Sequence, residues 1–483
     1  MLTAAIALNR FGLGARPGDA PPADPKLSLL GQFDRFEPRP AALAQVPPRS
    51  EIVQQIAEYY AEQRMEGRAK RQMQPAMQPA SMPTKPSQTD GLPDSAKRFL
   101  RRGIRDDYLV MTGARMASAL TTSAPFIERF VHFWANHFAV SVDKLPVIPM
   151  AGLLEFEAIR PHVLGKFSDM LLAVEQHPAM LLYLDQAQSI GPGSQAGQFV
   201  ARRGGQKRGL NENLAREILE LHTLGVRTGY TQADVTEFAR ALTGWTVSGL
   251  GRGPAARLVG GGQTGEFAFA DIMHEPGDRQ IIGRRYSQDG EGQARQVLLD
   301  LAANPATAKH ISTKLARHFA GDYPPQAMVD RLTQAYLKSG GDLPTIYRAI
   351  LNSPEAWAPQ PLKFKTPWEW SVSALRALDQ RELDPQVAGA LMNQLGQPVW
   401  KPGSPAGFDD IAASWAAPEA LVRRVEVAQR LAQRASSNVD PRALAEKVLP
   451  GALGEQTRAA IGRAESPAEG LALLLVSPEF VRR

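Results

Sequence analysis

The chain has 483 residues, of which 43% are hydrophobic and 22% are charged, a composition typical of a soluble globular protein with a large core. Its 55 lysines and arginines against 49 acidic residues give a net charge of +6, and no basic run is interleaved with aromatic residues, so nucleic-acid binding is not indicated. The absence of cysteine excludes disulfides, thiolate metal sites and a cysteine nucleophile.

The first residues of the sequence do not predict export. About eight apolar-leaning residues precede Asn9 and Arg10, and no basic region comes before them, which is too short for a signal peptide. No apolar run reaches the ~20 residues of a membrane span. As written, the sequence predicts a cytoplasmic protein, and a periplasmic location by co-export with a partner is left open.

Apolar periodicity predicts helices over most of the chain. The expected helices cover residues 2–10, Ser50 to about Gln63, 96–120, 123–140, 147–160, 163–184, 211–225, a segment starting at Thr231 that Thr231 and Asp234 cap, and most of the chain after 290. A proline-rich stretch at 18–48 and a stretch at 186–210 rich in Gly, Gln, Arg and Ser are expected to be loops. The expected fold is one large, mainly all-α domain over 1–483.

Two segments interrupt the helical pattern. Residues 66–95 repeat Met, Gln, Pro and Ser, which predicts a mobile low-complexity loop within the domain. Residues 248–288 are rich in glycine and then alternate between apolar and polar residues, which predicts a small β-hairpin or an irregular insertion.

The segment NENLAREILELHTLG at 211–225 is denser in ionisable groups than an apolar helix face requires. Two polar rows follow from helical spacing, with Glu212, Arg216 and Glu220 in one row and Asn213 and Glu217 in the other. One interpretation is a solvated ladder of ion pairs. The other is a carboxylate-rich pocket wall in which Arg216 holds two carboxylates in place.

Histidines are the second group of candidate site residues. His132 and His137 in HFWANHF are five residues apart, or ~140° on a helix, so at most one of them is expected to join a site with Asn136. The alternative for either is a core histidine. His274 on the glycine-rich insertion is a candidate general base or ligand, with Arg279 nearby, or else an ordinary loop histidine.

The spacings exclude one class of metal site. No Glu-x-x-His pair is present, so a helical di-metal carboxylate site is not expected. A mononuclear metal held by Glu217, His137 and His274 remains open. The sequence also lacks a P-loop, a GxGxxG after a strand, a GxSxG elbow and an HExxH motif, so no nucleotide or flavin is indicated.

The segment GQPVWKPGSPAGF at 396–408 predicts a rigid loop. With Trp415, its Trp400 and Phe408 could form a stacking platform for a sugar or flat ligand, or an irregular lid over the core. Lys365, which stands before Pro367, could point into the same cavity.

Several segments of the sequence together form a specific combination of motifs: LNRFGLGA at 8–15, FWANHF at 133–138, residues 211–225, GYTQADVTEFARALTGW at 229–245, HEPGDRQIIG at 274–283, KFKTPWEW at 363–370, and residues 396–408. In these segments, and over nearly its whole length, the chain resembles the bacterial domain-of-unknown-function 1800 family. The resemblance implies a helical, mostly bacterial protein and no settled activity. It also implies a partner, because genes of this family are often adjacent to genes of the domain-of-unknown-function 1501 family, which is similar to exported sulfatases and alkaline phosphatases.

Two functions are therefore expected as alternatives. The first is an enzyme that hydrolyses or modifies a polar substrate in a pocket lined by Glu212, Arg216, Glu217 and Glu220 and approached by His137 and His274. In that scheme Glu217 or His274 is the base, Arg216 orients and Asn136 binds. The second is a non-catalytic accessory protein that acts with the phosphatase-like partner, in which the same polar residues form a structural network.

Overall fold

Helices make up most of the molecule. The computed structural model describes residues 1–72, 92–202, 210–250, 263–435 and 439–483. The strands of these residues form only two small antiparallel pairs, so the fold is mainly all-α with a small β insertion, as the sequence predicts. None of the helices within those ranges combines the length and the apolar character needed to cross a membrane.

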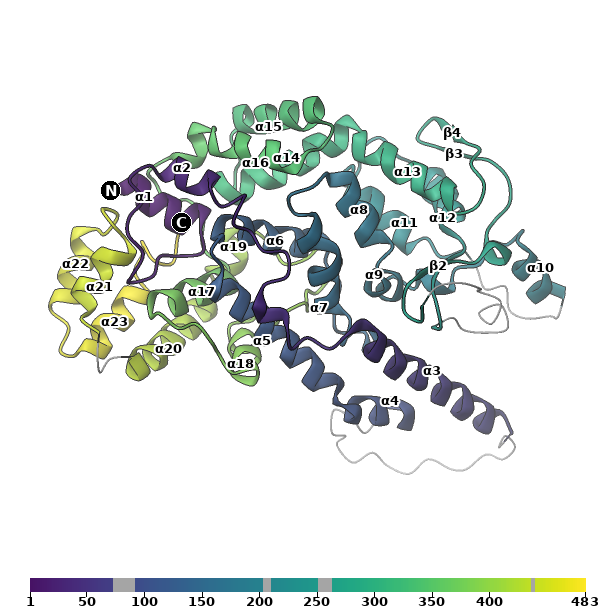
Figure 1. The fold of residues 1–483 in the computed structure, drawn as a ribbon, viewed down its shortest axis with the longest axis horizontal. Coiled ribbons are helices and arrows are strands. Elements are labelled where there is room, and N and C mark those ends of the chain that lie inside the picture. Colours follow the sequence, from purple (N-terminus) through teal and green to yellow (C-terminus); the bar gives the residue numbers. More distant parts are fainter. Residues whose placement is uncertain (73–91, 203–209, 251–262, 436–438) are drawn as a thin grey trace.

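The N-terminal part of the chain ends in the central helix α6 (Figure 1). Its elements are α1 (Leu2–Ile6), η1 (Ala7–Phe11), α2 (Pro25–Leu30), η2 (Ala41–Leu43), α3 (Arg49–Gln72), α4 (Asp94–Phe99), η3 (Leu100–Ile104), α5 (Arg105–Thr121) and α6 (Pro125–His137). Pro125 occupies the first turn of α6, where its missing N–H costs no hydrogen bond.

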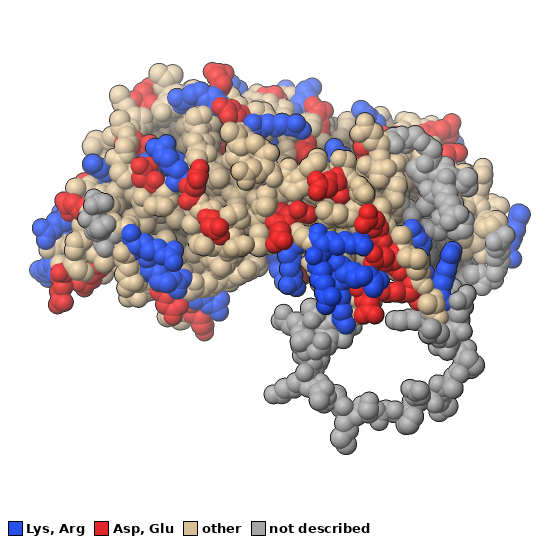
Figure 2. Space-filling view, turned by 60° about the horizontal axis from the view of Figure 1, so that its bottom comes forward, with Lys and Arg blue, Asp and Glu red and all other residues tan. Residues whose placement is uncertain are grey.

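The α3–α4 pair projects from the body and carries a dense group of charges (Figures 1 and 2). Glu66 on α3 accepts hydrogen bonds from the backbone and side chain of Ser95 and pairs with Arg98 on α4. These contacts extend α3 to Gln72, so the prediction of a loop over 66–95 is wrong for 66–72, and α4 begins at Asp94. Residues 73–91 of that prediction lie outside the described residues.

The middle of the chain forms short helices, of which η5 packs against α6. They are η4 (Leu145–Val147), α7 (Ala151–Leu153), η5 (Leu154–Ile159), η6 (Arg160–His162), α8 (Phe167–Glu175), α9 (Pro178–Tyr183), η7 (Gln186–Gln188), α10 (Gln195–Arg202), α11 (Asn213–Glu217), η8 (Ile218–His222) and α12 (Gln232–Leu242). The capping box of Thr231 and Asp234 on α12 is confirmed. The stretch 186–210 is not all loop, because Ala196 on α10 packs with Ala270 and Met273; residues 203–209 lie outside the described ranges.

The β insertion consists of two strand pairs. Strand β1 (Trp245–Val247) pairs with β2 (Phe267–Phe269), and β3 (Arg279–Ile281) forms a hairpin with β4 (Arg284–Tyr286). Ile282 and Gly283 turn this hairpin with φ of 49° and 72°, as a two-residue turn requires. The predicted β-hairpin within 248–288 is therefore confirmed for its described part, which leaves out 251–262.

The rest of the chain is mostly helical; α13 to α16 arch over α6, and the later helices lie on the side of the two termini (Figure 1). Its elements are η10 (Asp271–Met273), α13 (Glu291–Ala303), α14 (Pro305–Ala320), α15 (Gln326–Ser339), α16 (Leu343–Leu351), η11 (Pro354–Trp357), α17 (Pro367–Ala377), α18 (Pro385–Gln394), α19 (Ala412–Trp415), α20 (Pro418–Ala435), α21 (Pro441–Val448), α22 (Glu455–Gly462) and α23 (Pro467–Leu475). Several begin with proline behind a capping side chain, for example Asn304 before α14 and Thr366 before α17.

Residues from both ends of the chain pack against the same core. Phe11 contacts the rings of Phe126 on α6 and Phe319 on α14. The Lys363 and Arg483 backbones exchange two hydrogen bonds, which clip residues 481–483 onto the segment before α17. Helix α6 is thus surrounded by packed elements, and one stripe of its surface faces a cavity.

Candidate functional site

A cavity of about 320 Å³ lies between α6, α14, the start of α17 and the loop at 396–410. Helix α6 contributes Arg129, His132, Phe133, Asn136 and His137 to its wall. These positions recur at spacings of three and four, so they form one wide helical stripe. Both histidines border the cavity because a stripe of this width spans their separation, which differs from the expectation that at most one would join a site with Asn136.

Helix α14 supplies the cationic side of the cavity, with His310, Lys314, Arg317 and His318 on its wall. The Lys314 Nζ lies 2.9 Å from Nδ1 of His137 on α6. Burial, opposed by the negative charge of Asp410, lowers the pKa of Lys314 to about 8. Burial and the positive charge of Lys314 lower the pKa of His310 to about 4 and that of His137 well below its ordinary value. Both imidazoles are therefore neutral at pH 7.

The hydrogen bonds of His137 determine its tautomer. Its Nε2 lies 3.1 Å from the backbone carbonyl of His222, which can only accept, so Nε2 carries the proton. Its Nδ1 is then a lone pair and accepts from the Lys314 ammonium. His222 is itself held by Glu175, with 2.7 Å between Nδ1 and Oε1. A chain of buried contacts thus fixes the position of the Lys314 amine.

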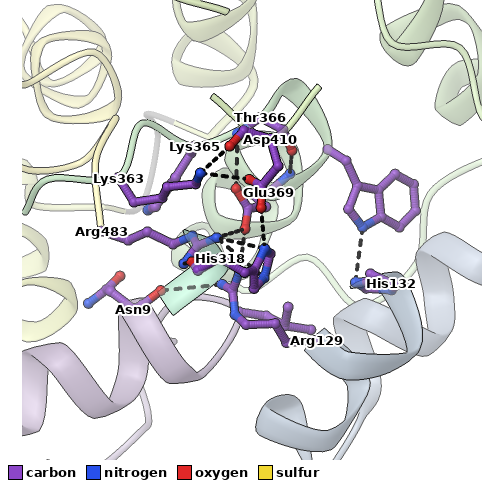
Figure 3. Close-up of polar contacts among 12 residues, drawn as sticks. Asn9, Arg129, His132, His318, Lys363, Lys365, Thr366, Glu369, Asp410 and Arg483 are labelled. Carbon is purple, nitrogen blue, oxygen red and sulfur yellow. Dashed lines mark hydrogen bonds and ion pairs between the residues drawn. The ribbon is translucent and has the colours of Figure 1, made fainter. Parts of the chain in front are cut away.

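A network of buried charges forms the floor of the cavity (Figure 3). Glu369 on α17 pairs with Arg129 and, at 2.7 Å, with Nη2 of Arg483. It is also the third residue of the α17 capping box and accepts from the backbone of Thr366 at 3.0 Å. Burial opposes ionisation of Glu369, but the charges of Arg483 and Arg129 outweigh it and lower the pKa of the carboxyl. One side chain therefore helps to start a helix and pairs with two arginines.

The second half of this floor is centred on Asp410. Its Oδ2 accepts from Nδ1 of His318 at 2.8 Å, and its Oδ1 lies 3.0 Å from Nζ of Lys363 (Figure 3). Lys363 also pairs with Asp322 at 3.0 Å. Although burial opposes it, His318 and Lys363 lower the pKa of Asp410. Burial lowers the pKa of His318 to about 4, and Asp410 only partly offsets this effect. Asp410 is thus an anion with a hydrogen bond to His318 and an ion pair with Lys363.

Aromatic rings form the wall opposite α14. The Arg115 guanidinium lies between the rings of Trp368 and Trp400, at 4.1 and 5.6 Å from their centroids. Arg115 Nε and Trp400 Nε1 both donate to Glu155, at 2.7 and 3.0 Å. Trp400 holds a left-handed backbone with φ of 47°, which costs a non-glycine residue free energy. The surrounding contacts offset that cost.

Asn136 fixes the loop that closes the cavity. Its side chain donates to the carbonyl of Phe408 at 2.8 Å and accepts from the Phe408 N–H at 2.7 Å. Gly407 has φ of 83° and approaches so closely that an added Cβ would lie 2.8 Å from Oδ1 of Asn136. The amide that the sequence predicts as a binding group is used by the protein to hold its own backbone.

Some of the predicted site residues meet at this cavity. His137, Asn136, Glu220 and Trp400 line it. The predicted ladder exists, with Arg216 lying 3.2 Å from Glu212 and 3.5 Å from Glu220. Glu212 also accepts from Thr236 at 2.7 Å and from Gln232 at 2.8 Å, so it ties α11 to α12. The row is an ion-pair ladder that touches the cavity only through Glu220.

Other predicted residues lie elsewhere. Asn213 is exposed, and Glu217 is partly buried, which raises its pKa, but neither lies on the cavity wall. His274 Nδ1 lies 2.8 Å from the carbonyl of Thr243, and Arg279 donates to the carbonyls of Glu275 and Pro276, so both hold the β insertion together. The expected grouping of Glu217, His137 and His274 on one pocket wall is therefore not what the cavity contains.

Two predictions about the aromatic loop and the lysine differ from the structure. Trp415 lies behind Phe408, with 6.2 Å between the ring centroids, and donates to the Asp409 carbonyl at 2.7 Å instead of lining the cavity. Lys365 is fully buried outside the cavity, with Nζ 4.5 Å from the Phe480 ring centroid, and burial lowers its pKa to about 7.

Within the described ranges, no three His, Asp or Glu side chains are grouped to hold a metal ion.

Sequence reasoning missed the α14 residues and the charged floor. A signal for α14 is present, because His310, Lys314 and Arg317 recur at spacings of four and three and so share one face. Arg129 and Glu369 lie on different helices far apart in the sequence, so no spacing pattern predicts that they meet. Residues from the segments 8–15, 133–138, 211–225, 363–370 and 396–408 line the cavity, whereas 229–245 and 274–283 contribute none.

Comparison with known proteins identifies a family. No curated protein and no solved structure matches the chain. The family model described as "Protein of unknown function (DUF1800)" matches residues 6–482. Since this match covers nearly the full length, the chain belongs to the domain-of-unknown-function 1800 family.

Proposed function

We propose that the protein is an enzyme that hydrolyses or otherwise modifies a small polar substrate in the cavity, with Lys314 as the proton-transfer group. The observation that carries the proposal is the contact of 2.9 Å between the Lys314 Nζ and the His137 Nδ1 on the cavity wall. A cavity of about 320 Å³ is at the lower end of the range for ligand pockets, which favours a small substrate.

Lys314 suits this role because its pKa of about 8 lies close to physiological pH. About half of its amine is neutral at pH 8, whereas an ordinary lysine is almost fully charged there. In a hydrolysis, the neutral amine would take a proton from water as the water oxygen attacks the substrate, and the resulting ammonium would return that proton to the leaving group. His137 acts as a positioning residue, since its neutral ring directs the amine through Nδ1.

The carboxylates of the cavity are less suited to be the base. Glu369 and Asp410 are paired with buried cations, which lower their pKa values and make them poor proton acceptors at pH 7. Glu220 pairs with Arg216 at 3.5 Å. These groups support the site by fixing charge and geometry.

The test is a screen of small esters, amides, phosphate esters and sulfate esters with the protein and its Lys314→Met variant. We expect turnover of at least one class, a rate that rises with pH through about 8, and a loss of roughly 10²–10⁴-fold in Lys314→Met. Lys309→Met is the matched control, because Lys309 is exposed on the same helix. Turnover that Lys314→Met retains, or no turnover of any class, would contradict the proposal.

A second candidate function is that of an accessory protein for a phosphatase- or sulfatase-like member of the domain-of-unknown-function 1501 family. The observation in its favour is an exposed apolar face on α20, formed by Leu421, Val422 and Val425, which are 39%, 57% and 41% exposed. Exposed apolar side chains that gather on one face are typical of interaction surfaces. Mixing the two purified proteins should give a complex that Val422→Glu abolishes, and the absence of a complex would remove this candidate.

A further inference from the structure

The charges on the cavity wall are not balanced. All four carboxylates there are already engaged: Glu220 with Arg216, Glu369 with Arg129 and Arg483, Asp410 with His318 and Lys363, and Asp409 with the Ser414 hydroxyl at 2.7 Å. The cations divide into two groups. Arg115 pairs with Glu155 and Arg129 pairs with Glu369, so each of these two guanidinium groups has a carboxylate partner.

Lys314 and Arg317 are the other two cations, and unlike Arg115 and Arg129 they have no carboxylate partner among the described residues. Among the residues that the structure describes, neither has a carboxylate oxygen within ion-pair distance, and the only side-chain hydrogen bond of Lys314 is to neutral His137. The Arg317 Nε is buried and has no hydrogen-bond partner within the described part of the chain. A buried guanidinium nitrogen without a partner costs free energy that a ligand could recover.

We propose that Lys314 and Arg317 form an oxyanion subsite in this cavity, which binds a carboxylate or phosphate group of the substrate. The two residues are three apart on α14 and both line the cavity, so their cationic ends face the same space. Arginine offers a fork of N–H donors that matches such oxygens, and lysine adds a point charge. Phe133, Trp368 and Phe408 on the other walls would contact the apolar remainder of the substrate.

This inference rests on the proposed function only in naming the substrate of the same cavity. It also predicts that binding and protonation are coupled. The groups around Lys314 are His137 on α6, His310 and Arg317 on α14, His222 beyond His137, and Asp410 on the loop. The histidines are neutral or paired, so a bound anion is the new charge beside the amine, and it favours the ammonium form. With an anionic substrate bound, the neutral amine that acts as the base is therefore reached only at a pH above 8. Anion binding should therefore take up a proton above pH 8 and weaken as pH rises.

The experiment is titration calorimetry of the full chain with benzoate, phenyl phosphate and the neutral isostere benzamide. We expect at least one anion to bind at least tenfold more tightly than benzamide, and Arg317→Gln to weaken that anion at least tenfold while leaving benzamide unchanged. A preference for benzoate identifies a carboxylate subsite, and one for phenyl phosphate identifies a phosphate subsite. Lys309→Gln, on the exposed face of α14, serves as the control and should bind like the wild type.

Two further measurements sharpen the test. Titrations at pH 8.5 in buffers with different ionisation enthalpies should show proton uptake by the wild type and none by Lys314→Gln. The inference is overturned if benzamide binds as tightly as the anions, if Arg317→Gln binds normally, or if no proton is taken up.

The outcomes separate this inference from the proposed catalysis. Anion binding that depends on Arg317, without turnover of any substrate class, would leave the subsite standing and remove the enzyme. Turnover of anionic and neutral substrates that depends on Lys314 but does not change in Arg317→Gln would support the enzyme and remove the anion subsite.

Discussion

Replacing Glu369 with glutamine should destabilise the protein strongly. The carboxylate pairs with Arg129 and Arg483, whose side chains are 3% and 0% exposed. Glutamine keeps the shape and can still fill the third position of the capping box, so helix α17 should still begin at Pro367. What the variant removes is the negative charge between two buried guanidinium groups.

The magnitude follows from the two arginines left behind. Removing one partner of a buried pair costs about 3–5 kcal/mol, because the remaining charge stays desolvated without compensation. The entropy of unfolding scales with chain length, so for a chain of 483 residues this corresponds to a midpoint of thermal unfolding lower by roughly 3–5 °C. Glu469→Gln is the matched control, since Glu469 occupies the same position of α23 but is exposed, and it should change stability by less than about 0.5 kcal/mol.

The pH dependence supplies an independent check. The folded-state pKa of Glu369 is lowered from its ordinary value of 4.5, so its contribution is present above pH 4.5 and is lost as pH falls through the folded-state pKa. Calorimetric melting of both proteins from pH 7 to pH 3 should show their midpoints converging below pH 4.5. An equal midpoint at pH 7, or a gap that widens in acid, would refute the role given to this carboxylate.

Two other predictions concern the walls of the cavity. Gly407→Ala should cost more than about 1 kcal/mol of stability, because φ of 83° and the contact with Asn136 leave no room for Cβ. Gly403→Ala is the control, since no described atom lies within 4 Å of the added Cβ, and it should change stability by less than about 0.5 kcal/mol. Equal melting temperatures of the two variants would contradict this prediction. Burial lowers the pKa of His310 to about 4 in the folded state, so between pH 6.5 and pH 4 the unfolded chain binds more protons than the folded one. The folded state therefore loses stability as the pH falls through this interval, and His310→Asn should reduce that loss. Urea unfolding at several pH values measures the slope, and an unchanged slope would exclude His310 as a contributor.

The fold was largely predictable because its signals are local. The periodicity of α6 and the capping box of Thr231 and Asp234 each depend on residues within a few positions of one another. The error at 66–72 arose because α3 is extended by contacts between Glu66, Ser95 and Arg98, which lie about thirty positions apart. Low complexity describes composition and cannot report such contacts.

The site was less predictable because it depends on charges that meet across the fold. Asn136, His137, Glu220 and Trp400 were found as individual candidates. Glu217 has the same side chain as Glu220, and His274 the same as His137, but Glu217 and His274 do not line the cavity. Nothing in the neighbouring sequence distinguishes the residues that line it from those that do not. Glu369 pairs with Arg129, 240 positions before it, and with Arg483, more than a hundred positions after it. Only the packing of α6 against α17 and the 481–483 segment brings these charges together.

The backbone hydrogen bonds between residues 363–365 and 481–483 affect the order in which the protein can fold during its synthesis on the ribosome. Arg129 emerges early in synthesis, but Arg483 reaches Glu369 only after residue 483 has been added. Until then the growing chain carries an incomplete set of buried charges and an open apolar interior, and long-range closure of this kind is slow. We therefore expect the floor of the cavity to be completed only after residues 481–483 have paired with the segment at 363–369, when the helices from α1 to α17 are already available to pack.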